Sequence, residues 1–381
     1  MGPLKGVKVV EFAGIGPGPF CCMLLADMGA DVLRVDRAVN VNNDLYEPRF
    51  NVLLRGRKNI AVDLKSAKGV EAALKLCDQA DILIEGFRPG VMERLGLGPD
   101  VIFARNRKIV YGRMTGWGQD GPIAHTPGHD INYIALTGAL HAIGTKENGP
   151  VPPLNLVGDF GGGALYMAMG ALAAYIEAQK SGEGQVVDTS MVEGAASLMT
   201  SAYGMLAGGT FSEERETNRL DGGCHHYSVY ETSDGEHICI GSNEPKFYAI
   251  MLETVGLGGA ELPEQADRKG WPGMRKKLAA IFKTKTRDQW TEIMEQKEIC
   301  YAPVLRMSEA LTHHHNVHRG SFIEVAGVKQ PGPAPKFARM SDTPPSDPAH
   351  AGEHTKEGLA DWGILESEIA DLLQSGAVKQ R

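Results

Sequence analysis

The segment KGVKVVEFAGIGPGPFCCMLLADMGADVLRVDR, residues 5–37, decides the fold prediction. It opens with a short apolar strand at Val7–Phe12 and passes through a turn rich in glycine and proline. A helix is expected at Phe20–Met28 and a second strand at Val32–Val35. A helix between two short apolar strands is typical of a parallel βαβ unit. The segment therefore predicts an α/β domain that begins with a strand, a turn and a helix.

The same alternation of strands and helices continues to about residue 206. Further strands are expected at Ile60–Leu64, Asp81–Glu85, Lys108–Tyr111 and Gln185–Thr189. Helices are expected at Ser66–Gln79, Phe160–Lys180 and Met191–Leu206. Strands that alternate with helical patterns indicate one largely parallel sheet.

The pattern changes after residue 208. Residues 208–226 are rich in Gly, Glu, Arg and Asn, and a hairpin with an Asp-Gly turn follows at Tyr227–Gly241. Helical patterns come next, at about Glu244–Val255, Trp271–Phe282 and Arg287–Glu298. We therefore expect a large α/β domain with a parallel sheet at 1–207, a linker at 208–225, a smaller α+β domain at 226–330, and a strap with C-terminal helices at 331–381.

Composition and charge narrow the class of partner. The 381 residues carry 39 Lys+Arg and 47 Asp+Glu, a formal net charge of −8. A general nucleic-acid binder usually has the opposite sign, so we expect no nucleic-acid partner. The six cysteines form no CxxC pair and no zinc-type spacing, so reduced thiols and a cytoplasmic location are expected. The uncharged runs at 160–176 and 194–212 predict buried helices rather than membrane insertion.

The first turn imitates a dinucleotide-binding fingerprint. Gly14, Gly16 and Gly18 follow the first strand, and Asp36 follows the second at the distance of a ribose-binding acid. The match fails in detail, because Pro19 stands where the fingerprint needs glycine or alanine. Proline at 17 also removes a backbone N–H that a phosphate could use. NAD binding is therefore disfavoured, and a Rossmann-like turn without the dinucleotide is the simpler interpretation.

Basic side chains gather after the early strands, where ligands of open α/β sheets bind. Singly, each is most often a solvated surface charge; together, in an acidic chain, they fit a small polyphosphate ligand. They are Arg37, Arg55, Arg57, Lys58, Lys65, Arg88 and Arg94.

Two further residues stand beside glycines at expected helix starts. His129 follows Gly128, where free N–H groups could hold an oxyanion, but a lone histidine is more often structural. Asp159 precedes three glycines and an apolar helix, so it is either an N-cap or a carboxylate in a tight pocket. These alternatives stay open on the residues alone.

A run of histidines at 313–315, with His318, invites a metal hypothesis. Adjacent residues on a helix point in different directions, and Glu309 is the only carboxylate at helical spacing from His313. A solvated helix end is therefore expected, and no metal site is predicted.

Ordered sequence blocks from about residue 4 to 355 resemble those of the family III CoA-transferase superfamily, and in particular its alpha-methylacyl-CoA racemase branch. After residues 4–37, the matching blocks are RMTGWGQDGP at 113–122, GHDINYIALTGAL at 128–140, PLNLVGDFGGGAL at 153–165, GQVVDTSMVEG at 184–194, LDGG at 220–223, IGSNEPKFY at 240–248 and RGSF at 319–322.

The resemblance implies a large Rossmann-like domain, a smaller domain and an interlocked homodimer, with each active site between the large domain of one subunit and the small domain of the other. It implies that His129 and Asp159 are the acid/base residues and that Glu244 partners His129 from the small domain. It places the acyl chain of the substrate near Met191. The implied CoA contacts are Arg37, Val62, Asp63, Leu64, Lys65, Gly86, Phe87, Arg88, Arg94, Gly128, Ile131, Asn132 and Tyr133.

The implied reaction inverts the carbon alpha to a 2-methylacyl-CoA thioester. One group removes a proton on one face and another returns a proton on the opposite face, so the two need complementary protonation. A raised pKa is therefore expected for Asp159. The backbone N–H of Asp130 would stabilise the enolate oxygen. CoA is part of the substrate, and no metal, nicotinamide or pyridoxal is expected.

The alternative within the same superfamily is a CoA-transferase, in which an aspartate at position 159 is a nucleophile that forms an acyl anhydride and then a CoA thioester. Such transferases generally carry an aromatic residue where this chain has His129, and a glycine-rich loop near Ser242–Pro245. This chain has the racemase residues at both positions.

Overall fold

The computed structural model describes residues 2–43, 47–339 and 343–381. The chain folds into two compact units. Unit 1 contains residues 1–137, 153–199 and 317–381, and unit 2 contains residues 138–152 and 200–316. The expected domain limits of 1–207, 226–330 and 331–381 stay a prediction, since compactness within one chain does not define a part that folds alone.

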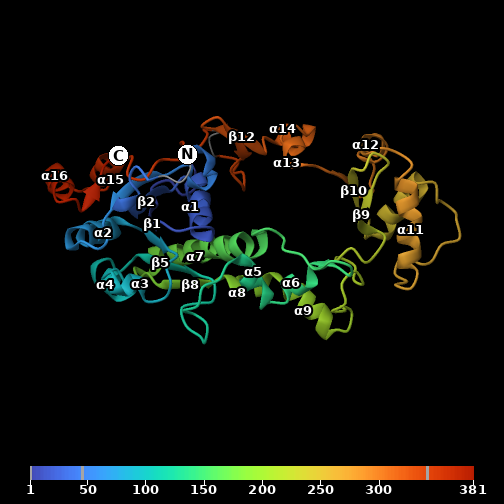
Figure 1. The fold of residues 1–381 in the computed structure, drawn as a ribbon, viewed down its shortest axis with the longest axis horizontal. Coiled ribbons are helices and arrows are strands. Elements are labelled where there is room, and N and C mark those ends of the chain that lie inside the picture. Colours follow the sequence, from blue (N-terminus) through green and yellow to red (C-terminus); the bar gives the residue numbers. More distant parts are fainter. Residues whose placement is uncertain (1, 44–46, 340–342) are drawn as a thin grey trace. The chain divides into compact units, whose positions relative to one another are not determined.

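Unit 1 is built on a seven-stranded sheet with the order β14-β3-β2-β1-β4-β5-β8 (Figure 1). Six strands run parallel, and only the short edge strand β14 is antiparallel to its neighbour. Their bounds are Lys8–Phe12 (β1), Asp31–Arg37 (β2), Lys58–Val62 (β3), Ile82–Glu85 (β4), Val110–Thr115 (β5), Val186–Ser190 (β8) and Val378–Lys379 (β14). The central strands are buried almost throughout, as expected for a parallel sheet with both faces covered.

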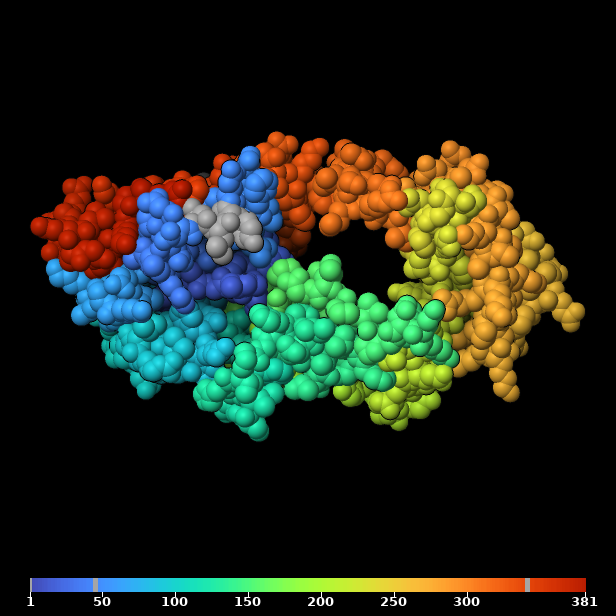
Figure 2. Space-filling model, viewed as in Figure 1, coloured from blue at the N-terminus to red at the C-terminus, as the bar shows by residue number. Residues whose placement is uncertain are grey.

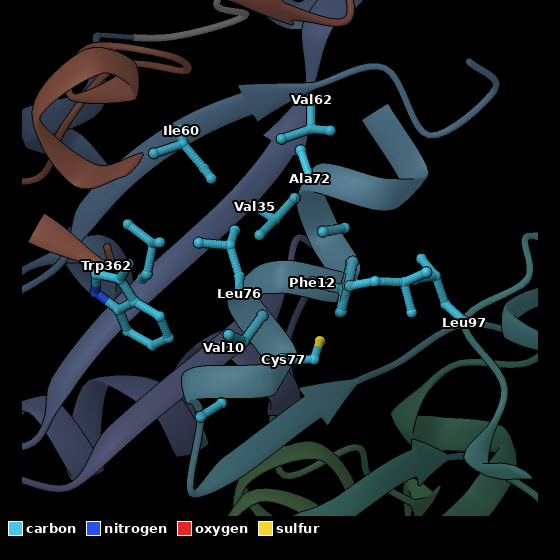
Figure 3. Close-up of a cluster of buried hydrophobic side chains, with 14 of the residues drawn as sticks. Val10, Phe12, Val35, Ile60, Val62, Ala72, Leu76, Cys77, Leu97 and Trp362 are labelled. Carbon is cyan, nitrogen blue, oxygen red and sulfur yellow. The ribbon is translucent and has the colours of Figure 1, made fainter. Parts of the chain in front are cut away.

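Helices cover both faces of this sheet and form two apolar cores. One core joins the strands to α2 (Ala67–Gln79), α4 (Pro99–Arg105), α15 (Thr355–Asp361) and α16 (Glu366–Gln374). Figure 3 shows its centre, with Phe12, Leu76 and Trp362 between strand and helix. The other core joins the strands to α1 (Pro17–Asp27) and α7 (Leu165–Ser181).

The C-terminal helices pack against the first strands of the chain, as the red and blue atoms in Figure 2 show. Trp362, in the same core as β1 and β2, is 1% exposed. The strand β14 extends the sheet by pairing Val378 with Val62. Sequence patterns did not predict this strand, because two residues carry no periodicity.

The segment before α7 is a π-helix, η4, over Leu156–Ala164. Its glycines allow contact between backbones: a side chain at Gly194 of α8 (Met191–Leu198) would lie 1.8 Å from the Gly162 carbonyl oxygen. π-helical turns are rare and frequently occur at functional sites. The helix expected at Phe160–Lys180 is therefore present as α7, but its first residues belong to the π-helix η4, which the sequence analysis did not predict.

The helix expected at Met191–Leu206 is divided into α8, in unit 1, and α9 (Thr200–Ala207), which belongs to unit 2. The remaining short elements of unit 1 are α3 (Val91–Arg94), α5 (Asp130–Ala135), β12 (Phe322–Val325), β13 (Val328–Pro331) and the 3₁₀ turns η1 (Ala38–Asn40), η2 (Pro48–Phe50) and η3 (Val52–Leu54).

Unit 2 contains a three-stranded antiparallel sheet with the order β11-β10-β9. The expected hairpin forms as β9 (Tyr227–Glu231) and β10 (His237–Gly241), and β11 (Tyr301–Val304) adds an unpredicted third strand. Its apolar core includes Phe282 and Trp290 from the helices. The other elements here are α10 (Pro245–Thr254), α11 (Trp271–Phe282), α12 (Arg287–Met294), α13 (Met307–Ala310), α6 (Ala139–Ala142), β6 (Gly144–Thr145) and β7 (Gly149–Pro150); α14 (His314–Arg319) crosses the limit between the units.

One helical run among the described residues, Leu156–Ser181, is long and apolar enough to cross a membrane by length and composition alone. A core helix passes the same test. The α7 part of this run packs on β5 and β8, and Met167 and Ala171 are fully buried in one core of unit 1.

A buried charge cluster lies beside β1. The Glu11 carboxylate is 1% exposed and pairs with the guanidinium groups of both Arg34 and Arg57. Arg34 also lies 3.4 Å from a carboxylate oxygen of Asp36.

Replacing Glu11 should therefore destabilise the protein strongly. Glu11→Gln removes the charge that balances two buried arginines, and we expect a loss of about 3–5 kcal/mol in the free energy of unfolding. The control is Glu357→Gln, which breaks an exposed pair with Lys58 and should change stability by less than about 1 kcal/mol. Denaturant titration measures both, and equal small effects would contradict the assignment.

Candidate active site

A cavity of about 680 Å³ opens at the carboxyl ends of the parallel strands in unit 1. It is lined by the segments that follow β1, β4 and β5 and by residues near the end of β2. From β1 the strand order runs to β2 and β3 on one side and to β4 and β5 on the other, so the direction of the sheet reverses between β1 and β4. Ligands of open α/β sheets bind at such switch points. The topology therefore marks this cavity as the site.

Asp159 lines the cavity from η4 and is half-buried. Its carboxylate oxygen Oδ2 accepts a hydrogen bond of 3.2 Å from the Asn155 side chain. Burial raises the pKa of this carboxyl group, and the nearby Asp130 carboxylate adds to the increase. The Asn155 hydrogen bond and the positive potential of His129 oppose it. The raised pKa expected for Asp159 therefore has a physical cause, its burial. Of the two alternatives left open by the sequence, Asp159 is a carboxyl group in a pocket, since the N-cap of η4 is Asn155.

Gly16 makes room for the Asp159 carboxyl group. It has a positive φ of 73°, and a side chain there would place its Cβ 3.0 Å from Asp159 Oδ2. Gly16, which resembles part of a dinucleotide-binding fingerprint, therefore allows the carboxyl group of Asp159 to approach the backbone closely. Asp36 is also engaged, accepting from the Arg37 N–H at 2.9 Å and the Asn40 side chain at 2.6 Å.

His129 lines the same cavity and is exposed. It is the N-cap of the short helix α5, with an extended backbone, and its N–H donates to the Asn132 side chain at 3.0 Å. Asp159 lines the same cavity from η4. An imidazole and a carboxyl group thus face one cavity.

Asp130 connects the two segments that carry these groups. Its buried side chain accepts the Asp159 backbone N–H at 2.7 Å, and Gly158 leaves the space that this contact requires. Among the described residues, no hydrogen bond occupies the backbone N–H of Asp130, the first of α5. Such a donor at a helix start is suited to an oxyanion.

Tyr133 holds the turn before α5 against the sheet. Its hydroxyl donates to the Gly128 carbonyl oxygen, and its ring meets Trp117 edge to face at 4.8 Å. Burial raises the pKa of Tyr133, with a further contribution from Asp159 and an opposing one from Arg88. A side chain at Gly116 would overlap this ring, so glycine is required there.

The structure divides the predicted cation cluster. Arg37 and Arg88 are exposed at the cavity, and neither forms an ion pair within the described residues. Arg55, Arg57 and Lys58 do not belong to the cluster, which corrects the sequence expectation. Arg55 pairs with Asp27 at 2.7 Å, Arg57 with Glu11, and Lys58 with Glu357 at 2.6 Å. Their partners are distant in sequence, so spacing could not reveal them.

Several other predicted contacts lie in or beside this cavity. Gly86, Phe87, Gly128 and Met191 line it. Ile131 and Asn132 lie on the exposed side of α5, next to the lining residue His129. Val62, Asp63, Leu64, Lys65 and Arg94 are outside the lining, and their contact with CoA stays a prediction.

Glu85 is a lining residue that sequence reasoning missed. It is 1% exposed, accepts the Phe87 N–H at 2.7 Å and pairs with Arg113 at 3.0 Å. Burial raises its pKa to about 7. Its hydrogen bond fixes the backbone of the Gly86–Arg88 turn. Its position at the carboxyl end of the expected strand was the one feature of the sequence that could have marked it as a site residue.

Glu244 belongs to unit 2, where it is the exposed N-cap of α10. The segment before it is anchored: Gln265 donates to the carbonyl oxygens of Ser242 and Asn243, each at 3.0 Å. This is a fixed turn rather than a glycine-rich loop.

The fold and cavity define an open α/β protein with a cavity at its strand ends that is lined by His129, Asp159 and two exposed arginines. Residues 4–355 match the family model of CoA-transferase family III, and the chain belongs to that family. It is 44% identical over 97% of its length to alpha-methylacyl-CoA racemase of Mus musculus, covering 96% of that protein. Identity to alpha-methylacyl-CoA racemase of Homo sapiens is 41%, with the same coverage of both chains.

The fold also matches the crystal structure of a CAIB/BAIF family protein from Brucella suis. The TM-score is 0.78 at 23% identity, over 95% of this chain and 99% of that one. This match concerns the fold; the family predicted from the sequence is confirmed by the family model and by the identity to the two racemases.

The raised pKa of Asp159 has a testable consequence for stability. An acid whose pKa is higher folded than unfolded is destabilising above its unfolded pKa, and the effect vanishes when both states are protonated. Asp159→Asn should therefore raise the thermal midpoint at pH 7, and the gain should shrink as the pH falls toward about 4. Thermal unfolding across pH measures this. A gain that persists unchanged in acid would contradict it.

Proposed function

We propose that this protein is a racemase that inverts the alpha carbon of 2-methylacyl-CoA thioesters. The observation that carries the proposal is the placement of His129 and Asp159 on one cavity at the strand ends. The similarity to alpha-methylacyl-CoA racemases over almost the whole chain supports the same reaction.

The two groups supply the base and the acid. In one direction neutral His129 removes the alpha proton and protonated Asp159 returns a proton to the opposite face. In the other direction ionised Asp159 is the base and the imidazolium of His129 is the acid. Burial of Asp159 favours the protonated form that the first direction requires. Each turnover moves one proton from Asp159 to His129 or back. The pair then either inverts the opposite enantiomer or exchanges its protons with solvent before it inverts the same enantiomer again.

The intermediate is an enolate, and its oxygen needs a hydrogen-bond donor. The Asp130 N–H at the start of α5 is suited to this role, because donors fixed in place stabilise developing charge. Arg37 and Arg88 would bind the phosphates of CoA, and Met191 would contact the acyl chain. CoA is part of the substrate, and this proton-transfer scheme requires no separate cofactor.

We also infer an interlocked homodimer in which Glu244 of a second copy stabilises the imidazolium. The large apolar side chains exposed along η4, α7 and α8 support such an assembly, because contiguous apolar surface marks interfaces. They are Leu156, Leu165, Met169, Ile176 and Leu198. A cytoplasmic location fits the six cysteines, all of which are free thiols.

The alternative is CoA transfer with Asp159 as nucleophile. An aspartate nucleophile needs no imidazole opposite it, whereas this cavity is lined by both Asp159 and His129. The turn before Glu244, held by Gln265, also differs from the glycine-rich loop expected of the transferases. Both observations favour the racemase.

Deuterium exchange tests the proposal. The purified protein is incubated in D2O with (2R)- or (2S)-2-methylacyl-CoA, without an acceptor acid. We expect alpha-deuterium uptake with inversion from both enantiomers. Absence of exchange, with CoA transfer once a free carboxylic acid is added, would establish the transferase instead.

The phosphate-binding role predicts a change in KM. Arg37→Ala and Arg88→Ala should each raise KM by about tenfold or more with little change in kcat, since their contacts are remote from the reacting carbon. Arg107→Ala is the control, because Arg107 is exposed outside the cavity and pairs with Glu183. A collapse of kcat at constant KM would contradict the assignment.

A further inference from the structure

Unit 2 contains a cluster of side chains that can bind a metal ion, and none of them is a lining residue of the cavity. The Nε2 atom of His314 lies 3.4 Å from Glu295 Oε1, and that of His313 lies 3.7 Å from the same oxygen. One ligand atom from each of these three residues lies within 4.8 Å of the other two. By spacing alone, Glu309 is the carboxylate expected near these histidines; in the structure, Glu295 lies beside them instead.

The reason is that Glu309 is engaged elsewhere. Its carboxylate binds the Arg287 guanidinium at 2.6 and 3.0 Å and accepts the Arg306 N–H at 2.7 Å. The Arg287 hydrogen bonds lower the pKa of Glu309 to about 2. A carboxylate held in this way is not available to the histidines.

The same contacts hold the segments that carry Glu295 and the two histidines in place. Arg287 begins α12 and ties it to Glu309 in α13, while Glu295 lies directly after the end of α12. The backbone N–H of His313 donates to the Glu309 carbonyl oxygen at 3.1 Å. Thus α12 is fixed to the 306–313 segment at its first residue, and Glu295 meets the histidines at its other end.

The two distances to Glu295 are close to those of a tetrahedral metal centre, and the two imidazoles offer ligand atoms within 4.8 Å of each other. Zinc binds imidazole nitrogen at about 2.0–2.1 Å and carboxylate oxygen at about 2.0–2.2 Å, so neighbouring ligand atoms of a tetrahedral site lie about 3.3–3.5 Å apart. The 3.4 Å contact has this length, and the 3.7 Å contact needs only a small side-chain adjustment.

We propose that His313, His314 and Glu295 form a binding site for a divalent zinc-class metal ion. Two imidazoles and one carboxylate are a donor set suited to Zn²⁺ and Co²⁺. The His314 side chain is 66% exposed, which leaves a fourth position open to water. A bound ion would fasten the end of α12 to the start of α14 and stabilise unit 2, since it binds the folded form.

The competing explanation is an ion pair between Glu295 and protonated histidine. An ion pair needs no metal and forms in acid, whereas metal binding needs neutral imidazoles and weakens in acid. The two explanations therefore make opposite predictions about added metal at pH 7.5.

The test uses the full-length protein, stripped with a chelator and titrated with Co²⁺ at pH 7.5. We expect one equivalent of Co²⁺ to bind with the strong visible bands of a four-coordinate ion, and Zn²⁺ to displace it. Zn²⁺ should also raise the thermal midpoint of unfolding.

The matched variants separate this site from general binding to a histidine-rich surface. His314→Ala and Glu295→Gln should each weaken Co²⁺ binding by about tenfold or more, and His315→Ala should change it by less than about twofold. Absence of stoichiometric binding, or equal losses in all three variants, would overturn the proposal. Racemase activity is measured in parallel; its failure leaves the metal titration unaffected, so the two proposals are tested separately.

Discussion

The absence of side chains at two positions around Asp159 is the constraint on which the site depends. Gly16 leaves room for the carboxyl group, and Gly158 lets Asp130 accept the Asp159 N–H. The π-helical turn η4 contacts α8 backbone to backbone at Gly162 and Gly194. These contacts fix a partly desolvated carboxyl group at the carboxyl edge of the sheet, and its raised pKa follows from that position.

The sequence predicted those parts that have a strong local pattern. The alternation of strands and helices predicted β1, α1, β2, β3, α2, β4, β5 and β8, and the glycines beside His129 and Asp159 marked both residues as candidates. It could not predict β14, which is too short for a period. Nor could it show that Arg55 and Arg57 are paired in the interior, because Asp27 and Glu11 are 28 and 46 residues away.

The roles proposed for the site residues rest on their unequal environments. Asp159 is half-buried beside another carboxylate, while His129 is exposed at a helix start. Such a difference suits a pair in which one member begins protonated, as the acid, and the other unprotonated, as the base. The buried Glu85 supports the adjacent turn that carries Arg88. In the proposed mechanism, proton transfer and phosphate binding thus use different loops at one edge of the sheet.

The most direct test of this account is proton exchange in D2O by the variants His129→Ala and Asp159→Ala, measured separately with each enantiomer of a 2-methylacyl-CoA. Because each base serves one face, each variant should keep exchange with one enantiomer and lose it with the other, and the two variants should differ in which enantiomer they retain. Equal loss with both enantiomers in folded variants that still bind CoA would contradict one base on each face.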